Sequence, residues 1–216
     1  EIAGSTHFLE HILFKGTKLW PSAKAISEAI EGTGGIMNAS TDKEMTVYWC
    51  KVAEPYFRIS LSVLVDMILN PLLDVQELEK ERQVIYEELR MTNDYPSHRV
   101  DLLIDEMLWP NQPMGRDVGG SLESVANISR DDLLNLMERQ YGPNNVVISV
   151  AGNVRHEDVV EQLTRSTDTW VYRDPWKWSP VDCEQSRPAI RLEYRETEQA
   201  HVCLGIPGVS MEEPDR

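Results

Sequence analysis

Apolar residues recur at intervals of three and four along much of the chain, and this spacing predicts a series of amphipathic helices. The first helix is expected to be capped by Ser5 or Thr6 and to stop at Gly16, because hydroxyl side chains favour helix starts and glycine favours helix ends. The other predicted helices cover residues 21–31, 55–69, 75–92, 97–109, 131–141 and 156–168.

Segments rich in β-branched and aromatic residues predict strands between these helices. Residues 36–41 and 45–52 follow a Gly-Gly pair and are expected to form a hairpin, whose first strand lies either at a sheet edge or inside the sheet. Further strands are expected at residues 146–152, 189–194 and 200–206. The Trp- and Pro-rich residues 170–188 could form a domain linker or an aromatic cover on the sheet, and the strand pattern that follows them favours the cover. Together these elements predict an α+β fold, with helices packed on a largely antiparallel sheet.

Composition narrows the function classes. The chain has 216 residues, 41% of them hydrophobic and without a long apolar run, so a globular protein without a membrane span is expected. The net charge of -15 disfavours nucleic acid as a partner and would attract basic polypeptides. Cys50, Cys183 and Cys203 are odd in number and widely spaced, without a CxxC motif, which favours a reducing compartment and disfavours zinc held by thiolates.

The first predicted helix carries the motif His-x-x-Glu-His, formed by His7, Glu10 and His11. Residues three and four positions apart lie on the same helix face, so these three side chains converge. Two histidines one turn apart can hold zinc, and the carboxylate can then activate a water molecule. The alternative is an ordinary amphipathic helix whose histidines are surface or core residues.

A second group of candidate residues lies on the helix predicted at residues 75–92. Glu81 and Glu88 fall on the face that Leu78 and Ile85 would bury, whereas most other acids on this helix would face solvent. A buried carboxylate needs a cation, so Glu88 becomes a candidate third metal ligand. Glu87 is rotated by about 100° from Glu88 and remains a rival on sequence grounds.

With these motifs, the chain resembles the pitrilysin/insulinase family of zinc metallopeptidases, and within it the processing-peptidase branch. The H-x-x-E-H order and the position of Glu88 carry the resemblance. Residues 34–48 resemble the strand pair that holds substrate in this family, residues 81–88 its second metal-site helix, and residues 141–147 the entry to a later strand. The similar segments therefore extend over most of the chain.

Together with the resemblance, these residues imply a zinc-dependent endopeptidase. His7, His11 and Glu88 would hold Zn²⁺ with a water as fourth ligand. Glu10 would act as general base and then as general acid, and Glu81 would complete the catalytic set by orienting a histidine or the ion.

The resemblance also implies partners. Asn38, Ala39 and Ser40 would bind the backbone of an extended polypeptide, possibly basic and presequence-like, as an added β-strand. Residues 1–216 would form the N-terminal catalytic, zinc-binding domain, truncated at both ends, while the second homologous domain or subunit that completes the active site is absent. A homodimer is a further arrangement that the sequence leaves open.

Two other function classes compete with this prediction. A non-catalytic relative of the same family could bind polypeptide or scaffold a complex, although such relatives usually lose residues of the motif. A metal-dependent hydrolase of small molecules is disfavoured by the strand that resembles a peptide-binding edge.

Overall fold

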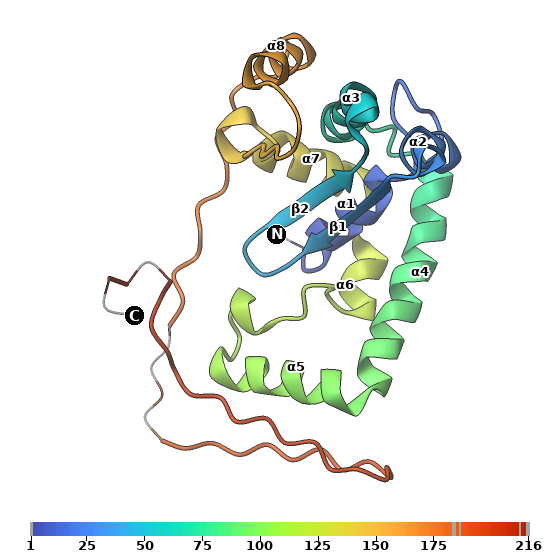
Figure 1. Cartoon of the computed structure of the whole chain (residues 1–216). Helices are drawn as coiled ribbons and strands as arrows, with labels where there is room; N and C mark the ends of the chain where they lie inside the picture. Colours follow the sequence, from blue (N-terminus) through green and yellow to red (C-terminus); the bar gives the residue numbers. More distant parts are fainter. Residues whose placement is uncertain (1, 183–184, 186, 212, 215–216) are drawn as a thin grey trace.

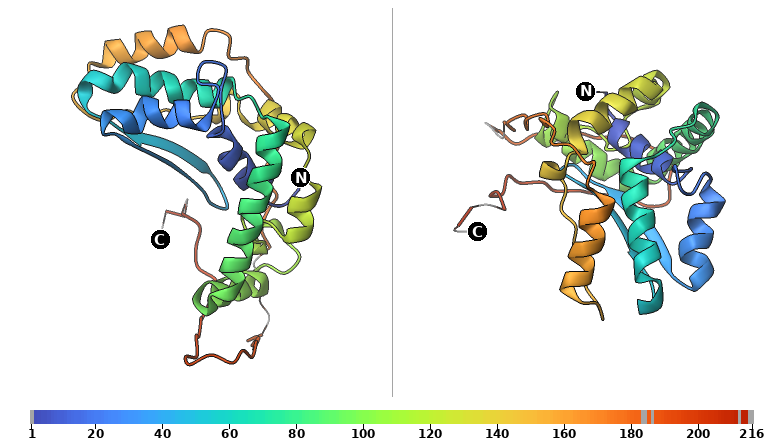
Figure 2. Two further views of the ribbon diagram at one scale, coloured as in Figure 1. Left: turned by 90° about the vertical axis from the view of Figure 1, so that its right-hand side faces the viewer. Right: turned by 90° about the horizontal axis from the view of Figure 1, so that it is seen from above.

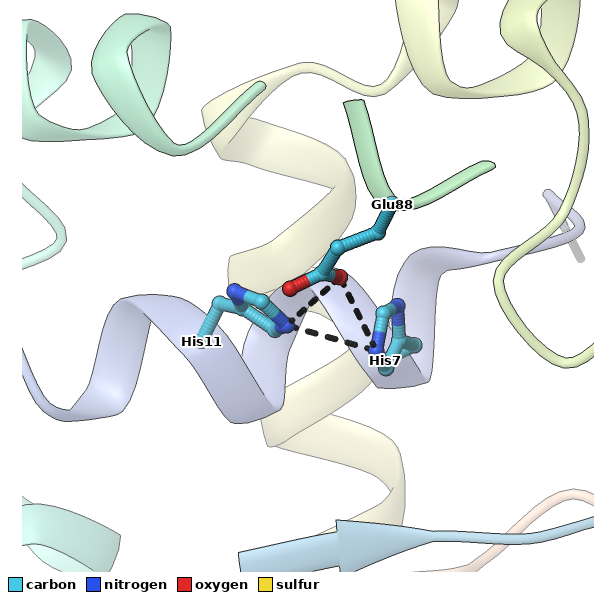
Figure 3. Close-up of side chains that lie close together, drawn as sticks. All are labelled: His7, His11 and Glu88. Atoms are coloured by element: carbon cyan, nitrogen blue, oxygen red, sulfur yellow. Dashed lines mark hydrogen bonds and ion pairs between the residues drawn. The ribbon is translucent and has the colours of Figure 1, made fainter. Parts of the chain in front are cut away.

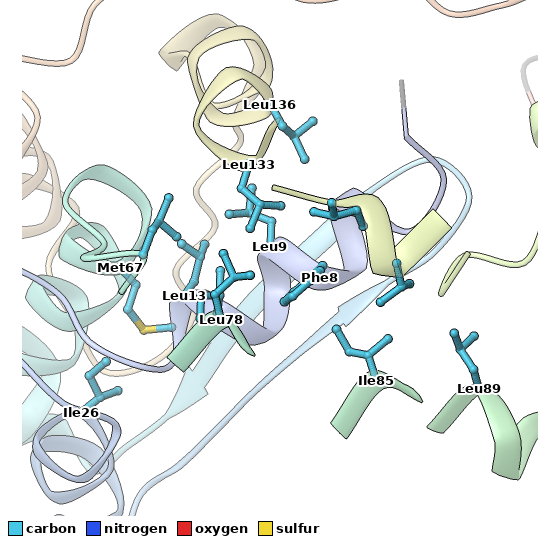
Figure 4. Packing of buried hydrophobic residues seen from close by; sticks show 14 of the residues in the cluster. Phe8, Leu9, Leu13, Ile26, Met67, Leu78, Ile85, Leu89, Leu133 and Leu136 are labelled. Atoms are coloured by element: carbon cyan, nitrogen blue, oxygen red, sulfur yellow. The ribbon is translucent and has the colours of Figure 1, made fainter. Parts of the chain in front are cut away.

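Helix α1 (Ser5–Leu13) lies at the centre of the fold, against one face of a β-hairpin and in contact with helices α4 (Val75–Asp94) and α7 (Arg130–Gln140) (Figures 1 and 2). This computed structural model describes residues 2–182, 185, 187–211 and 213–214. The apolar stripe of α1 is completely buried, and it packs against apolar side chains from α2 (Ala23–Ile30), α3 (Phe57–Leu69), α4 and α7 (Figure 4). The predicted motif helix is therefore the centre of the hydrophobic core.

The other helices pack either on α1 and the hairpin or on the helices that contact them (Figure 1). Each helix predicted from apolar spacing is present, with ends shifted by a few residues, whereas the short helix α6 was not predicted. They are α2 (Ala23–Ile30), α3 (Phe57–Leu69), α4 (Val75–Asp94), α5 (Pro96–Leu108), α6 (Leu122–Asn127), α7 (Arg130–Gln140) and α8 (His156–Ser166). Short 3-10 turns lie at η1 (Glu31–Thr33), η2 (Glu54–Tyr56), η3 (Pro113–Gly115) and η4 (Pro143–Asn145).

The hairpin consists of β1 (Ile36–Thr41) and β2 (Thr46–Lys51), paired antiparallel with Thr41 opposite Thr46. Asp42 shapes the turn, because its Oδ1 accepts hydrogen bonds from the backbone N–H groups of Glu44 and Met45. In the described part of the chain no other strand pairs with β1 or β2. Both strands are therefore edge strands there, and β1 offers a free edge.

The predicted cap of α1 is wrong. Ser5 is the first helical residue, Thr6 follows inside the helix, and the N-cap is Gly4, with φ of 88° and no side-chain hydrogen bond. A Cβ atom at Gly4 would lie 2.5 Å from the carbonyl oxygen of Gly119, so this start requires both a left-handed backbone and close backbone approach. Long-range packing therefore replaces the local hydroxyl cap.

The strands predicted at residues 146–152, 189–194 and 200–206 are also wrong. These segments are extended but belong to no sheet, and their apolar side chains are exposed, as Val147 and Ile190 are at 93% and 95%. The Trp-rich segment does not cover the sheet, since Trp178 is 73% exposed; residues 183, 184 and 186 of this segment lie outside the described residues. A strand needs a partner for its backbone groups, and the described chain supplies none to these segments.

The extended segment after α8 instead runs past α5 (Figures 1 and 2). Arg99 on α5 donates to Glu193 over 2.9 Å, and a Cβ atom at Gly205 would lie within 3.1 Å of side-chain atoms of Ile104 and Leu108. Ion pairs and local packing, not sheet hydrogen bonds, therefore attach this segment to the helices.

Two of the three cysteines lie within the described part of the chain, and both are free: Cys50 and Cys203. Cys183 lies outside the described residues. Burial raises the pKa of the Cys50 thiol, against a smaller opposing effect of its hydrogen bond with Ser60. Cys50 is therefore a neutral, half-buried side chain of the hairpin and not a thiolate ligand.

The predicted α+β class is confirmed, although within the described residues the sheet is reduced to one antiparallel hairpin covered by helices. Among the described helices, none is both long enough and apolar enough to cross a membrane. The helices and hairpin thus place the His-x-x-Glu-His motif between a long helix and a free strand edge.

Arg82 joins α4 to helix α6 and to the connection that follows it. Its side chain is 9% exposed, donates to the backbone oxygens of Val125 and Ile128, and lies 5.1 Å from the centre of the Phe8 ring. The guanidinium therefore satisfies two buried carbonyls and packs on the motif helix at the same time.

Replacing Arg82 with methionine is expected to lower the free energy of unfolding by about 2–4 kcal/mol, because two buried carbonyl oxygens would lose their donor. Urea unfolding followed by circular dichroism measures this change. Arg165→Met is the matched control, since this arginine pairs with Glu161 while 73% exposed, and we expect a change below about 0.5 kcal/mol. Equal effects of the two substitutions would contradict the proposed role of Arg82.

Candidate metal centre

Three side chains from α1 and α4 point toward one another (Figure 3). The Nε2 atoms of His7 and His11 are 3.3 Å apart, and Oε2 of Glu88 lies 3.4 Å from Nε2 of His11 and 3.9 Å from Nε2 of His7. The structure therefore brings together the three residues predicted as metal ligands, one helical turn supplying the two histidines and α4 the carboxylate.

These donors fit a zinc ion by their chemistry and spacing. Tetrahedral zinc with bonds to nitrogen and oxygen of about 2.0–2.1 Å separates its ligand atoms by about 3.3 Å. Two of the observed separations, 3.3 and 3.4 Å, match this value, and the third, 3.9 Å, is modestly longer. Two neutral imidazole nitrogens and a carboxylate oxygen are also the donor set of many catalytic zinc sites.

The surroundings of the two histidines are unequal. Burial, reinforced by the neighbouring His11, lowers the pKa of His7, and its Nδ1 is buried without a hydrogen-bond partner in the described part of the chain. Burial would also lower the pKa of His11, but the hydrogen bond with Glu81 and the charges of Glu88 and Glu10 outweigh it and raise that pKa. His7 therefore offers a neutral ring, while His11 sits among carboxylates.

Glu81 lies behind His11, on the side away from Glu88. Its Oε2 is 3.3 Å from Nδ1 of His11, its Oε1 is 2.6 Å from Nζ of Lys15, and its side chain is 8% exposed. Burial would raise the pKa of Glu81, but the hydrogen bonds from His11 and Lys15 outweigh it and lower that pKa. Glu81 thus remains an ionised acceptor that can hold Nδ1–H of His11 and leave Nε2 free.

The geometry distinguishes Glu88 from Glu87 as the candidate third ligand. Glu87 is 72% exposed and forms an ion pair with Arg90 on the solvent side of α4. Glu88 is half-buried and reaches both histidines. The predicted burial of Leu78, Ile85 and Glu81 on the same face is confirmed.

Glu10 extends from α1 toward the hairpin. The hydroxyl of Thr41, the last residue of β1, donates a hydrogen bond to Oε2 of Glu10 and lies 3.1 Å from the hydroxyl of Thr46 on β2. Glu10 therefore has a defined partner on the strand edge, although the sequence analysis did not identify Thr41. The position of Thr41 at the end of the predicted substrate strand was the signal in the sequence that could have identified it.

Two tyrosines also lie near Glu10 and were not identified from the sequence. The hydroxyls of Tyr48 and Tyr141 are 3.0 Å apart. Burial is the main cause that raises the pKa of both phenols, to about 12 for Tyr141, and the charge of Glu10 acts in the same direction. Both tyrosines therefore remain neutral hydrogen-bonding groups on the buried side of the hairpin.

The predicted substrate-binding residues lie on β1, beside the free edge. Asn38 and Ser40 are exposed and Ala39 is half-buried. Oδ1 of Asn38 accepts a hydrogen bond of 2.9 Å from the backbone N–H of Ala39. The edge strand thus ends at Thr41, which contacts Glu10, so the strand and the candidate metal centre are joined through one residue.

Comparison with known sequences agrees with this geometry. A family profile described as insulinase, peptidase family M16, matches residues 1–121. The chain belongs to the insulinase family of peptidases. A second profile, described as the inactive domain of peptidase family M16, matches residues 127–216. The predicted resemblance is therefore confirmed, and both profiles belong to the same family.

Two relatives and one solved structure illustrate the match within the insulinase family. The chain is 36% identical over 213 residues to the zinc protease YmxG of Bacillus subtilis, covering 98% of this chain and 51% of that protein. It is 32% identical over 219 residues to a probable mitochondrial-processing peptidase subunit beta of Arabidopsis thaliana, covering 100% and 41%. The first half of the periplasmic protease PqqL of Escherichia coli superposes with a TM-score of 0.73 at 24% identity, covering 84% and 40%.

The chain spans about half the length of the curated relatives that it matches. The structural match to a first half, at 24% identity, shows the same fold. YmxG is named a zinc protease, in agreement with the cofactor predicted from the motif. Peptidase chemistry is thus the activity of the family to which the chain belongs.

Proposed function

We propose that this chain is the zinc-binding half of a metalloendopeptidase that hydrolyses peptide bonds in extended polypeptides. The convergence of His7, His11 and Glu88 carries the proposal, because their three ligand atoms lie at separations that suit tetrahedral zinc. When bound there, zinc would polarise the scissile carbonyl and lower the pKa of a water molecule.

The protein side chains would supply the proton transfers and the orientation. Glu10 takes a proton from the attacking water and delivers it to the leaving amine as the peptide bond breaks. The Thr41 hydroxyl holds one oxygen of Glu10 and leaves the other available for this proton. Glu81 orients His11 by accepting its Nδ1–H, and thereby supports the ligand without contacting substrate.

Substrate would bind along β1 as an added strand. The exposed edge supports this placement, since an incoming backbone can pair there while its side chains alternate between the two sides. A substrate carbonyl would compete with the Asn38 side chain for the N–H of Ala39, and Ser40 would lie next to the bond that is cleaved. The net charge of -15 favours basic segments, including presequence-like ones.

A second homologous half would complete the active site. The proposal rests on the coverage of the relatives, whose lengths are about twice that of this chain. By resemblance to the family, that half would contribute an arginine and a tyrosine and close over the strand edge. Residues 1–216 would then form the catalytic domain of one subunit, and a homodimer would be a second way to enclose substrate. The bacterial and mitochondrial relatives support the bacterial cytoplasm or the mitochondrial matrix as its location.

The test is cleavage of an unstructured, basic peptide library by the complete subunit with and without a chelator. We expect cleavage that stops on chelation and returns when stoichiometric zinc is added, because the ligands remain in place while the ion is removed. Mass spectrometry of the products identifies the cleaved bonds. Cleavage that persists after complete removal of metal would overturn the proposal.

A non-catalytic, peptide-binding relative is the second candidate. The match of residues 127–216 to the profile of the inactive domain favours it. The metal content of protein purified without added metal separates the two candidates. One zinc ion per chain supports the peptidase, whereas a metal content near zero at neutral pH supports the scaffold.

A further inference from the structure

Lys15 follows helix α1 and contacts Glu81, not the three candidate metal ligands themselves. Its Nζ lies 2.6 Å from Oε1 of Glu81, while Oε2 of the same carboxylate faces Nδ1 of His11. The Glu81 carboxylate is therefore held at both oxygens, by an ammonium on one side and by a histidine ring on the other.

The backbone around Lys15 is fixed by the fold. The N–H of Lys15 donates to the oxygen of Ile12 over 3.0 Å, and the oxygen of Gly16 accepts from Leu72 over 3.0 Å. The first bond continues the last turn of α1, and the second attaches Gly16 to the connection between α3 and α4. The Lys15 ammonium thus reaches Glu81 from a hydrogen-bonded turn, and the Lys15 side chain is 26% exposed.

This arrangement determines which way His11 points. Glu81 is 8% exposed, and a carboxylate with so little contact with water depends on the charge of its protein partners. With Oε1 held by Lys15, Oε2 remains directed at Nδ1 of His11, so Nε2 of His11 faces Nε2 of His7 and Glu88. Without Lys15, Glu81 would lose one of its two partners and could turn away from the ring.

We propose that Lys15 is a positioning residue of the metal centre, which orients His11 through Glu81 and thereby strengthens zinc binding. This inference rests on the proposed function, since it requires His7, His11 and Glu88 to bind zinc. The coupling runs along a chain of contacts from Lys15 to Glu81 to His11, and none of these contacts requires substrate.

The test measures the zinc dissociation constant of the 216-residue chain by competition with a chromophoric chelator. Lys15→Met is expected to weaken zinc binding about tenfold, the lower part of the range for partners that orient a ligand. Lys15→Arg keeps the positive charge, and its zinc affinity should stay within about twofold of that of the original protein. Because Lys15 would fix the orientation of His11, we also expect the absorption bands of the cobalt-substituted chain to change in Lys15→Met.

Lys43→Met is the matched control. Lys43, on the hairpin turn, is also 26% exposed and pairs with Asp105 on α5 over 3.0 Å, and it donates to the backbone oxygens of Met114 and Arg116. Lys43→Met should leave the zinc dissociation constant and the cobalt spectrum unchanged. In a Glu81→Gln background, Lys15→Met should change affinity by less than about twofold, because the pathway is already interrupted.

Several outcomes would overturn the inference. Lys15→Met with the original affinity and cobalt spectrum would do so, and so would a full loss that persists in the Glu81→Gln background. Circular dichroism verifies folding, and Lys15→Gln replaces Lys15→Met if that variant does not fold. Failure of the unmodified chain to bind zinc would instead reject the proposed function, so the two failures are distinguishable.

Discussion

Replacing Glu10 with glutamine is expected to abolish peptide hydrolysis while zinc remains bound. Glu10 lies on α1 between the two histidines but contacts Thr41, so its loss removes the proposed proton acceptor without removing a proposed ligand. General acid and base catalysis contributes on the order of 10³-fold, and we expect a fall of that size in kcat. Steady-state kinetics of the complete subunit, with metal content measured in parallel, gives both quantities.

The control for this variant is Glu31→Gln. Glu31 also accepts a hydrogen bond from a hydroxyl, that of Ser27, but it lies on the exposed turn after α2 and far along the chain from the motif. Its substitution should change neither turnover nor zinc content. Turnover at the original level in zinc-loaded Glu10→Gln would remove Glu10 from the mechanism, whereas loss of zinc in that variant would assign it a role in binding.

Replacing Glu88 with glutamine is expected to weaken zinc binding by more than about 100-fold, beyond the range for residues that only orient a ligand. The amide has no negative charge and is a poor zinc ligand, and only two histidines would remain. Chelator competition with the 216-residue chain measures the loss, and hydrolysis by the complete subunit should fall in parallel.

Glu87→Gln is the control, because it removes the same charge from the neighbouring position of α4. Glu87 is 72% exposed and paired with Arg90, so zinc binding should remain unchanged. A loss of affinity in Glu87→Gln with retained affinity in Glu88→Gln would exchange the two assignments and would refute the arrangement in Figure 3.

The local sequence pattern predicts the helices and part of the site for a physical reason. A helix satisfies its backbone hydrogen bonds internally, so apolar spacing locates it without knowledge of its neighbours. The spacing of three and four residues also places His7, Glu10 and His11 on one face. The burial pattern of α4 places Glu81 and Glu88 on the inward side in the same way.

A strand forms only where a second strand pairs with it, and the local sequence does not show which segment that partner is. The hairpin was predicted correctly because its two strands are adjacent in sequence and pair with each other across Asp42. Residues 146–152, 189–194 and 200–206 carry the same kind of pattern, yet they remain extended and exposed where no neighbouring strand meets them. Alternation shows which face a strand would bury, but it does not provide the second strand.

The sequence by itself predicted the helices other than α6, the hairpin and the candidate ligands of the metal centre, with Glu87 still a rival of Glu88, because these depend on spacing within one helix or between adjacent strands. Only the tertiary structure decided which side chains meet. The approach of α4 to α1 brings Glu88 to the histidines, the backbone contact of Gly119 sets the start of α1 at Gly4, and the turn after α1 delivers Lys15 to Glu81. Such contacts arise between segments far apart in the chain, where packing, rather than periodicity, sets distance and direction.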